Sequence, residues 1–366
     1  MSLRCGIIGL PNVGKSTLFN ALTSSSVPTE NYPFCTIDPH IGIVDLPDKR
    51  LEKLKNIFNP QKVSPSTVEF LDIAGLVEGA SKGEGLGNRF LGQIRQVAAI
   101  IHVVRCFNDD NVTHVEGSVD PVRDAEIIET ELLLADLESL GKQYEKTEKL
   151  AKSGGKDDKK KFDVISRLSK HCNEGHRART FRADEDEVAI INSLHLLTQK
   201  PILYVSNVDE KEITHEQPGH IVQRLADFAN KEGNSAIRLC SKLEQEIAVL
   251  SDIERDLFLK EYNLSEPGLY KLIHAAFKLL DLETFFTGGS KQVRSWTIKK
   301  GTIAPDAAGE IHSDFQRGFI KAEVYKYDDL VHLGSEKAVK DAGLAKLQGK
   351  DYVVQEGDCI YFHFNV

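Results

Sequence analysis

The sequence predicts an α/β protein in which a mostly parallel sheet is interrupted by a helical hairpin and followed by a smaller α+β domain. Short apolar strands alternate with helical stretches over the first 120 residues and again after Pro201. A long helical pattern, broken at Gly154 and Gly155, separates these two regions, and short strands dominate after about residue 280. Alternation of strands and helices favours a parallel sheet with helices on its faces.

Length and composition indicate an ordinary globular protein. The chain has 366 residues, 41% hydrophobic and 28% charged, which allows two or three domains and excludes a disordered or fibrous chain. No apolar run approaches the roughly 18 residues that cross a bilayer, so we expect no membrane association. Net charge is −9, but residues 142–182 hold 13 Lys and Arg against 6 Asp and Glu. The chain therefore contains one basic segment, while the rest of the chain is net acidic.

The six cysteines are widely separated and form no C-x-x-C pair. This spacing indicates neither a disulfide framework nor a zinc ribbon. We therefore expect reduced thiols and a cytoplasmic protein.

The elements of the first domain follow from apolar runs and turn residues. We expect strands at Cys5–Ile8, Thr67–Leu71, Ala99–Val104, Ile202–Val205 and Ala236–Cys240. We expect helices at Lys15–Leu22, Phe90–Gln96, Val188–Leu197, His220–Asn230 and Leu269–Leu280. Because the alternation resumes after residue 200, the hairpin is inserted within this domain. The predicted boundaries are 1–124 and 198–280 for the first domain, 125–197 for the hairpin and 281–366 for the C-terminal domain.

Two further patterns define the other parts of the chain. In the hairpin, apolar residues spaced as a and d positions of an imperfect heptad predict the seam of a coiled coil. They are Ile127, Leu134, Leu137 and Tyr144 in the first helix. A second helical stretch follows, with Phe162, Ile165, Leu168 and Cys172. The C-terminal domain is expected to contain strands at Phe285–Thr287, Arg294–Ile298, Ala322–Tyr325, Tyr352–Val354 and Cys359–His363.

Residues 9–17 read GLPNVGKST and match the pattern G-x-x-x-x-G-K-[S/T] between a predicted strand and a predicted helix. Both glycines are needed because the backbone must wrap a phosphate and point N–H groups at its oxygens. In such loops the lysine bridges the β and γ phosphates and the hydroxyl binds Mg²⁺. We predict a P-loop nucleoside triphosphatase fold, with Lys15 also acting in catalysis. The loop residues expected to bind nucleotide are Asn12, Val13, Gly14, Lys15, Ser16 and Thr17.

Metal ligands are expected from three segments. Asp72 ends the second predicted strand in the sequence DIAG, where a carboxylate reaches the Mg²⁺ shell and the N–H of Gly75 senses the γ phosphate. Thr36, in the loop between the two motifs, could supply a second hydroxyl, although by itself it is equally well a turn residue. The predicted Mg²⁺ ligands are therefore Ser16, Thr36 and Asp72.

The nucleobase site is predicted after the strand Ile202–Val205, where GTPases carry Asn-Lys-x-Asp. Here the residues are Asn207, Val208, Asp209 and Glu210, so the guanine-binding aspartate is replaced by a side chain one methylene longer. Loss of a matched acceptor costs guanine specificity, because buried polar groups left unpaired are expensive. Asn207 and the Val208 backbone could then serve adenine. Ser241 follows the next strand, at the place of the last base-contacting loop.

These motifs, with the run from Asp72 to Leu91, resemble the Obg-related GTPases. Asn207-x-x-Glu210, the inserted hairpin and a C-terminal segment similar to a TGS (β-grasp) module narrow the resemblance to the YchF, or Obg-like ATPase, family. The resemblance covers essentially the whole chain. It implies a Ras-like G domain that binds ATP and GTP with a preference for ATP, hydrolyses slowly, and associates with the ribosome, particularly its large subunit.

Catalysis needs a group other than the glutamine that orients water in Ras-like enzymes, because Leu76 holds that position. By sequence alone, a lone histidine in a loop is more often a surface residue. The family resemblance nevertheless points to His114, whose imidazole suits water positioning near neutral pH. Asn12 could help to hold an activating K⁺, as in several P-loop GTPases, or merely shape the loop.

The basic hairpin, Lys142–Arg182, is predicted to contact the phosphates of RNA or the ribosome. The alternative is a solvated coiled coil. The candidate side chains are Lys149, Lys152, Lys156, Lys159, Lys160, Lys161, Arg167, Lys170, Arg177, Arg179 and Arg182. We expect a monomer. Two other functions stay open at this point: a GTP-dependent nucleic-acid-binding regulator in which hydrolysis is incidental, and a conventional GTPase switch.

Overall fold

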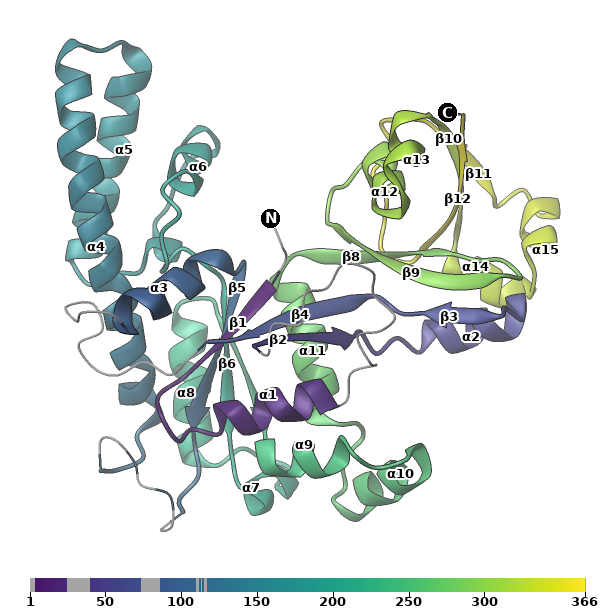
Figure 1. Cartoon of the computed structure of the whole chain (residues 1–366), viewed down its shortest axis with the longest axis horizontal. Helices are drawn as coiled ribbons and strands as arrows, with labels where there is room; N and C mark the ends of the chain where they lie inside the picture. The colour runs from purple at the N-terminus through teal and green to yellow at the C-terminus, as the bar shows by residue number, and fades with distance from the viewer. Residues whose placement is uncertain are drawn as a thin grey trace. The chain divides into compact units, whose positions relative to one another are not determined.

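The computed structural model describes residues 4–24, 40–73, 86–109, 112, 114 and 117–365. Contacts divide the chain into two compact units (Figure 1). One consists of Met1–Gly42 and Glu69–Leu272, and the other of Ile43–Val68 and Ile273–Val366.

The first unit contains most of a six-stranded sheet among the described residues. The strands of this sheet lie in the order β2 (Ile41–Asp45), β4 (Thr67–Asp72), β1 (Arg4–Ile8), β5 (Ala99–Arg105), β6 (Ile202–Asn207) and β7 (Ser235–Leu239). Strands β2 and β4 also include residues of the segment Ile43–Val68. The pairings of β1 with β4 and β5, of β5 with β6, and of β6 with β7 are all parallel. Both β5 and β6 are buried along their whole length, because the sheet is covered on both faces. The predicted α/β fold is confirmed.

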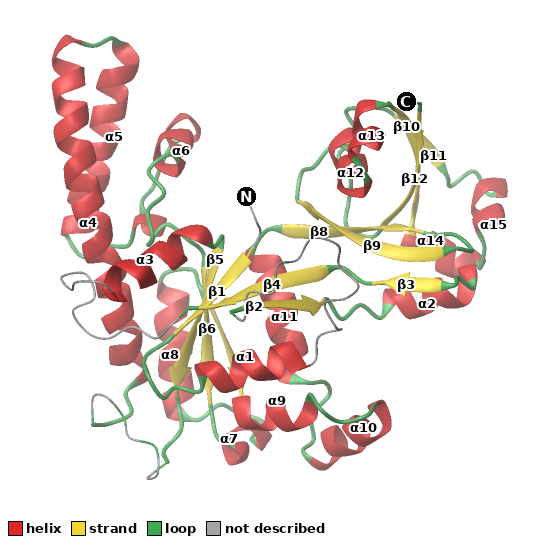
Figure 2. Cartoon of the chain, in the orientation of Figure 1, coloured by secondary structure: helices red, strands yellow, loops and turns green. Residues whose placement is uncertain are grey.

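Helices surround this sheet, as Figure 2 shows in red against the yellow strands. The helices of this unit outside the inserted hairpin are α1 (Lys15–Ser24), α3 (Leu86–Gln96), α6 (Glu185–Asn192), α7 (Glu210–Thr214), α8 (His220–Lys231), α9 (Ser241–Ile247), α10 (Asp252–Glu261) and the beginning of α11 (Gly268–Leu279). The helix α1 packs against α9, and α8 packs against β6 and β7. Along the chain, α1 follows β1 after the loop of residues 9–14, and α7 follows β6 after two residues.

The inserted hairpin consists of α4 (Pro121–Ser153) and α5 (Lys156–Asn173), joined through Gly154 and Gly155. The Asp120 side chain caps α4 by accepting from the N–H groups of Val122 and Arg123. The buried core between the helices includes Leu133, Leu140, Val164, Leu168 and Cys172.

The predicted heptad seam is wrong at Leu134, which is 41% exposed. Because α4 packs against α8 and β5 as well as α5, its buried surface is wider than an a/d stripe and includes Ile128, Leu132 and Ala135. Tyr144 does meet the second helix, with its ring centroid 5.1 Å from that of Phe162.

The second unit holds the other six-stranded sheet of the described residues. Its order is β11 (Lys346–Gln348), β10 (Phe319–Lys326), β12 (Asp358–Phe364), β8 (Leu282–Thr287), β9 (Gln292–Lys299) and β3 (Lys62–Ser64). Its helices are α2 (Arg50–Phe58), α12 (Ala304–Ile311), α13 (Ser313–Arg317), α14 (Tyr327–Leu333) and α15 (Glu336–Asp341). Consecutive residues Phe285 and Phe286 belong to two different buried clusters, as strand alternation requires.

The grouping of residues 43–68 differs from the expected domain boundaries. Here β3 pairs in parallel with β9, and Leu51 and Leu54 of α2 pack into the cluster around Phe286 and Val293. The sequence did not indicate this, because a three-residue strand has no readable periodicity.

Two further elements differ from expectation. The predicted helix Val188–Leu197 is α6, which begins earlier and ends at Asn192, and Leu197 instead donates its N–H to Asp136 at 2.7 Å. The predicted strand Tyr352–Val354 is reduced to a single bridge between Val353 and Ile303. No helix in the described part of the chain is long and apolar enough to span a bilayer.

Candidate functional site: a nucleotide-binding cavity

The phosphate-binding loop lies between β1 and α1. Gly14 has φ of +89°, and a Cβ at this position would collide with the Asn207 amide. A Cβ on Gly9 would lie 2.6 Å from the carbonyl oxygen of Val103. Both motif glycines are therefore required by the backbone path and by space. Asn12 also has a positive φ, +61°, which asparagine tolerates better than most residues.

The side chain of Asn207, at the end of β6, joins this loop to the start of α9. Its Nδ2 donates to the Val13 carbonyl at 2.8 Å, and its Oδ1 accepts from the Ser241 N–H at 2.9 Å. Asn207 and Ser241 are both buried. The sequence predicted that Asn207 contacts the nucleobase. In the structure its side chain also holds the phosphate-binding loop next to the start of α9.

At the phosphate end, Lys15 forms an ion pair with Asp72 at the end of β4. The Asp72 carboxylate therefore reaches the loop, and Ser16 lies beside Lys15 as an exposed residue of the first turn of α1. A carboxylate with hydroxyl oxygens is the hard ligand set that Mg²⁺ accepts, usually completed by water and phosphate. The residues present fit this ion. Thr36, Gly75 and Leu76 lie outside the described residues.

A cavity of about 650 Å³ opens beside the loop. It is lined by Asn12, Gly14, Thr17, Phe107, Asn108, Asp109, Val112, Asn207, Val208, Asp209, Glu210, Lys211, Cys240, Ser241, Lys242 and Gln245. This volume lies within the range of small-molecule sites. The structure thus brings the predicted loop residues together with the residues predicted for the nucleobase.

Sequence reasoning missed the residues that line this cavity after β5. Phe107 and Asp109 belong to a loop organised by buried Arg105, whose guanidinium donates to the carbonyls of Phe107, Asp109 and Val112 at 2.9–3.2 Å. These residues could have been predicted only from their place after β5, because ligands bind at the carboxyl ends of parallel strands.

Glu210 is the first residue of α7, which Asp209 caps by accepting from the N–H of Glu212 at 2.8 Å. Its carboxylate faces Lys242 of α9, with 2.8 Å between Oε1 and Nζ. Val208 is buried and donates its N–H to the Leu239 carbonyl at 2.9 Å. The Glu210 carboxylate therefore lines the cavity while it is ion-paired with the ammonium group of Lys242.

His114 lies outside the residues that line the cavity. Its Nε2 is 2.8 Å from Oδ2 of Asp124, a buried residue in the first turn of α4. Arg123 donates to the other carboxylate oxygen of Asp124 at 2.8 Å. His114 is thus attached to the base of the hairpin.

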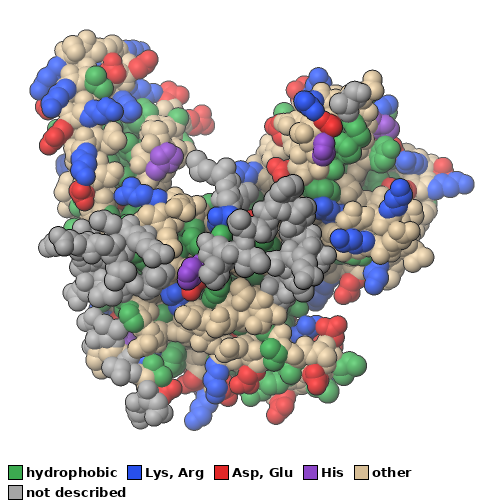
Figure 3. Space-filling view, in the orientation of Figure 1, with side chains coloured by type: hydrophobic (Ala, Val, Ile, Leu, Met, Phe, Trp, Pro, Cys, Tyr) green, Lys and Arg blue, Asp and Glu red, His purple; other side chains and the backbone are tan. Residues whose placement is uncertain are grey.

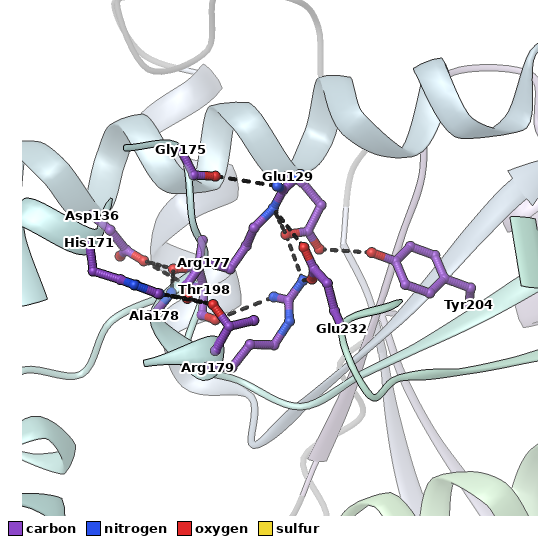
Figure 4. A network of polar contacts seen from close by, with 11 residues as sticks. Glu129, Asp136, His171, Gly175, Arg177, Ala178, Arg179, Thr198, Tyr204 and Glu232 are labelled. Carbon is purple, nitrogen blue, oxygen red and sulfur yellow. Dashed lines mark hydrogen bonds and ion pairs between the residues drawn. The ribbon is translucent and has the colours of Figure 1, made fainter. Parts of the chain in front are cut away.

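A buried ionic network joins the hairpin to the sheet (Figure 4). Glu129 accepts from Arg179 at 2.8 Å, from Arg177 at 3.3 Å and from the Tyr204 hydroxyl at 3.1 Å. Burial raises the pKa of Glu129, but the charges of the two arginines outweigh it and hold that pKa below its ordinary value. Arg179 also meets Glu232 at 2.7 Å.

This network corrects part of the predicted RNA-binding set. The side chains of Arg177 and Arg179 are only 17% and 9% exposed and are paired with carboxylates. Lys152, Lys160 and Arg167 are ion-paired within the hairpin or with α6. Fewer of the hairpin's cations are therefore both exposed and unpaired than residue type alone indicated.

The phosphate-binding loop, the Asp72 carboxylate and the cavity lined by Asn207 and Glu210 are the features of a nucleotide site. Together they place this chain among the P-loop nucleoside triphosphatases with a GTPase-type G domain. Residues 4–153 match the family model described as 50S ribosome-binding GTPase. Residues 282–365 match the model YchF-GTPase_C, described as a protein of unknown function.

Relatives match over the whole chain. It is 51% identical to "Ribosome-binding ATPase YchF" of Bacillus subtilis and 47% identical to that of Escherichia coli O157:H7, each over 100% of both chains. The solved structure of the Schizosaccharomyces pombe YchF GTPase is 39% identical, with a TM-score of 0.89 over 99% of this chain and 98% of that one. The chain therefore belongs to the YchF family.

Proposed function

We propose that this chain is a Mg²⁺-dependent nucleoside triphosphatase that binds and hydrolyses ATP, and GTP more weakly, and that associates with the ribosome or RNA. The observation that carries this proposal is one cavity with the phosphate loop at one end and Glu210 in the base position. The names of the relatives, which describe ribosome-binding ATPases, support it. The working unit is proposed to be a monomer.

The proposed metal ligands are Ser16, Thr36 and Asp72. Bound Mg²⁺ would supply positive charge that offsets the charge developing on the transferred phosphoryl group. Lys15, which meets Asp72 in the structure, would turn to the β and γ phosphates when a nucleotide binds. Asn12, which has a left-handed backbone conformation within the phosphate-binding loop, is the proposed K⁺ contact.

His114 is the proposed residue that positions the attacking water. The structure ties its Nε2 to Asp124, so His114 must leave that contact or present its other ring nitrogen to act in the cavity. The N–H of Gly75 is proposed to sense the γ phosphate.

The hairpin is the proposed contact for ribosomal RNA, within a cytoplasmic protein. Figure 3 shows Lys and Arg side chains over α4 and α5. Of the candidate side chains from the sequence, those that are exposed and have no ion pair to another described residue are Lys149, Lys156, Lys159, Lys170 and Arg182. Their electrostatic attraction to phosphates is strong at low salt and weakens as salt rises.

The test is turnover of ATP and of GTP by the full chain with Mg²⁺, with and without large ribosomal subunits. We expect slow hydrolysis of ATP, slower hydrolysis of GTP, and co-sedimentation with the subunits. Nucleotide binding without turnover in either condition would overturn the enzyme proposal and favour a regulator in which hydrolysis is incidental.

A further inference from the structure

Two oppositely charged side chains line the nucleobase end of the cavity from the first turns of two different helices. Glu210 comes from the start of α7 and Lys242 from the first turn of α9, and both line the cavity. Their charged atoms, Oε1 and Nζ, are 2.8 Å apart.

The backbone on each side of this pair is held in place. Ser241, the residue before Lys242, donates its N–H to Asn207, and Val208, two residues before Glu210, donates its N–H to the Leu239 carbonyl. These hydrogen bonds therefore hold the backbone that carries each side chain, and Asn207 also holds the phosphate-binding loop through the Val13 carbonyl.

The chemistry of the two purines makes this pair consequential. Guanine presents two adjacent donors, N1–H and the 2-amino group, which a free carboxylate accepts together. Adenine presents a lone pair at N1, which a free carboxylate repels. A carboxylate with one oxygen already bound to an ammonium group is a poorer acceptor for guanine and repels adenine less.

We propose that Lys242 is a specificity-determining residue: by pairing with Glu210 it withdraws that carboxylate from guanine and shifts the site toward adenine. The inference rests on the proposed nucleotide site and deepens it. It assigns the base preference to a pair of residues, whereas the replacement of aspartate by Glu210 alone would leave a free acceptor in the pocket.

The pair is exposed enough to be tested without loss of the fold. The Lys242 side chain is 72% exposed and that of Glu210 is 38% exposed, and such surface pairs contribute little to stability. Lys211, which lines the same cavity without an ion pair to another described residue, offers a matched control for loss of one positive charge.

The experiment measures dissociation constants of non-hydrolysable ATP and GTP analogues with Mg²⁺ by titration calorimetry on the full chain. The variants are Lys242→Ala, Lys211→Ala, Glu210→Gln and the double variant Lys242→Ala with Glu210→Gln. We expect Lys242→Ala to lower the preference for ATP over GTP about tenfold, as a charged acceptor becomes available to guanine. Lys211→Ala should leave the preference unchanged. In the Glu210→Gln background, Lys242→Ala should have no further effect on it.

An unchanged preference in Lys242→Ala, with both analogues still bound, would overturn this inference and leave the proposed function intact. A shift that persists in the Glu210→Gln background would also overturn it, because Lys242 would then act without its partner. Failure of the wild-type chain to bind either analogue would instead refute the nucleotide site itself.

Discussion

The Asn207 side chain donates to the main-chain carbonyl of Val13 across 2.8 Å, between the end of β6 and the phosphate-binding loop. The same amide accepts from the Ser241 N–H. One buried side chain therefore sets the spacing between the phosphate end and the base end of the cavity. A loop with positive φ at two residues needs such a support, since strained backbone persists only where its surroundings hold it.

Replacing Asn207 by Ala should destabilise the fold and weaken nucleotide binding together. Two buried main-chain groups lose their partners, which costs about 2 kcal/mol of unfolding free energy. Denaturant unfolding with and without nucleotide measures both effects. Asn230→Ala, an exposed change on α8, serves as the control. Wild-type stability and affinity in the Asn207 variant would contradict this role.

Replacing His114 by Ala should slow ATP turnover about 100-fold while nucleotide affinity stays as in the wild type. The reason is loss of the group proposed to position water, in a loop whose other residues remain. Single-turnover hydrolysis separates the chemical step from binding. His215→Ala, at an exposed histidine, should hydrolyse normally. Unchanged turnover in the His114 variant would remove this residue from the mechanism.

Neutralising Lys149, Lys156 and Lys159 together as glutamines should weaken binding to large ribosomal subunits. It should also make the salt dependence shallower by about 2 in log–log slope, because three phosphate contacts are lost. The matched control neutralises Lys142, Lys152 and Lys160, which are already ion-paired. An equal loss of affinity for the subunits in both triple variants would argue against Lys149, Lys156 and Lys159 as specific contacts.

Stability should fall on mild acidification because of His102 on β5. Burial lowers the pKa of this imidazole to about 4, from 6.5 in the unfolded chain. Between these values the unfolded state binds more protons, so stability declines as pH falls from about 6.5 toward 4, at up to about 1.4 kcal/mol per pH unit. Urea unfolding across this range should show a shallower decline for His102→Gln. The same slope in both proteins would contradict the assignment.

The sequence predicted the phosphate loop and the parallel sheet because both depend on local patterns. Gly14 and Lys15 belong to a motif whose spacing is fixed by phosphate geometry, and β5 is a continuous apolar run. The meeting of Lys15 with Asp72 also follows from parallel strands, whose carboxyl ends share one edge of the sheet.

Other features depend on contacts between distant residues and leave no local pattern. From their charge alone, Arg177 and Arg179 were predicted to contact RNA as the lysines of the hairpin were. The structure instead pairs both arginines with Glu129, about 50 residues earlier in the chain. The pairing of β3 with β9 joins segments more than 200 residues apart. The contact of Lys242 with Glu210 likewise joins the starts of two helices, α7 and α9, that come close together only in the folded protein.

The most direct test of the account is competitive titration of the purified full chain with ATP and GTP in the presence of Mg²⁺. We expect both nucleotides to compete for one site and ATP to bind more tightly. Tighter binding of GTP would contradict the proposed base pocket, and absence of heat with either nucleotide would contradict the site as a whole.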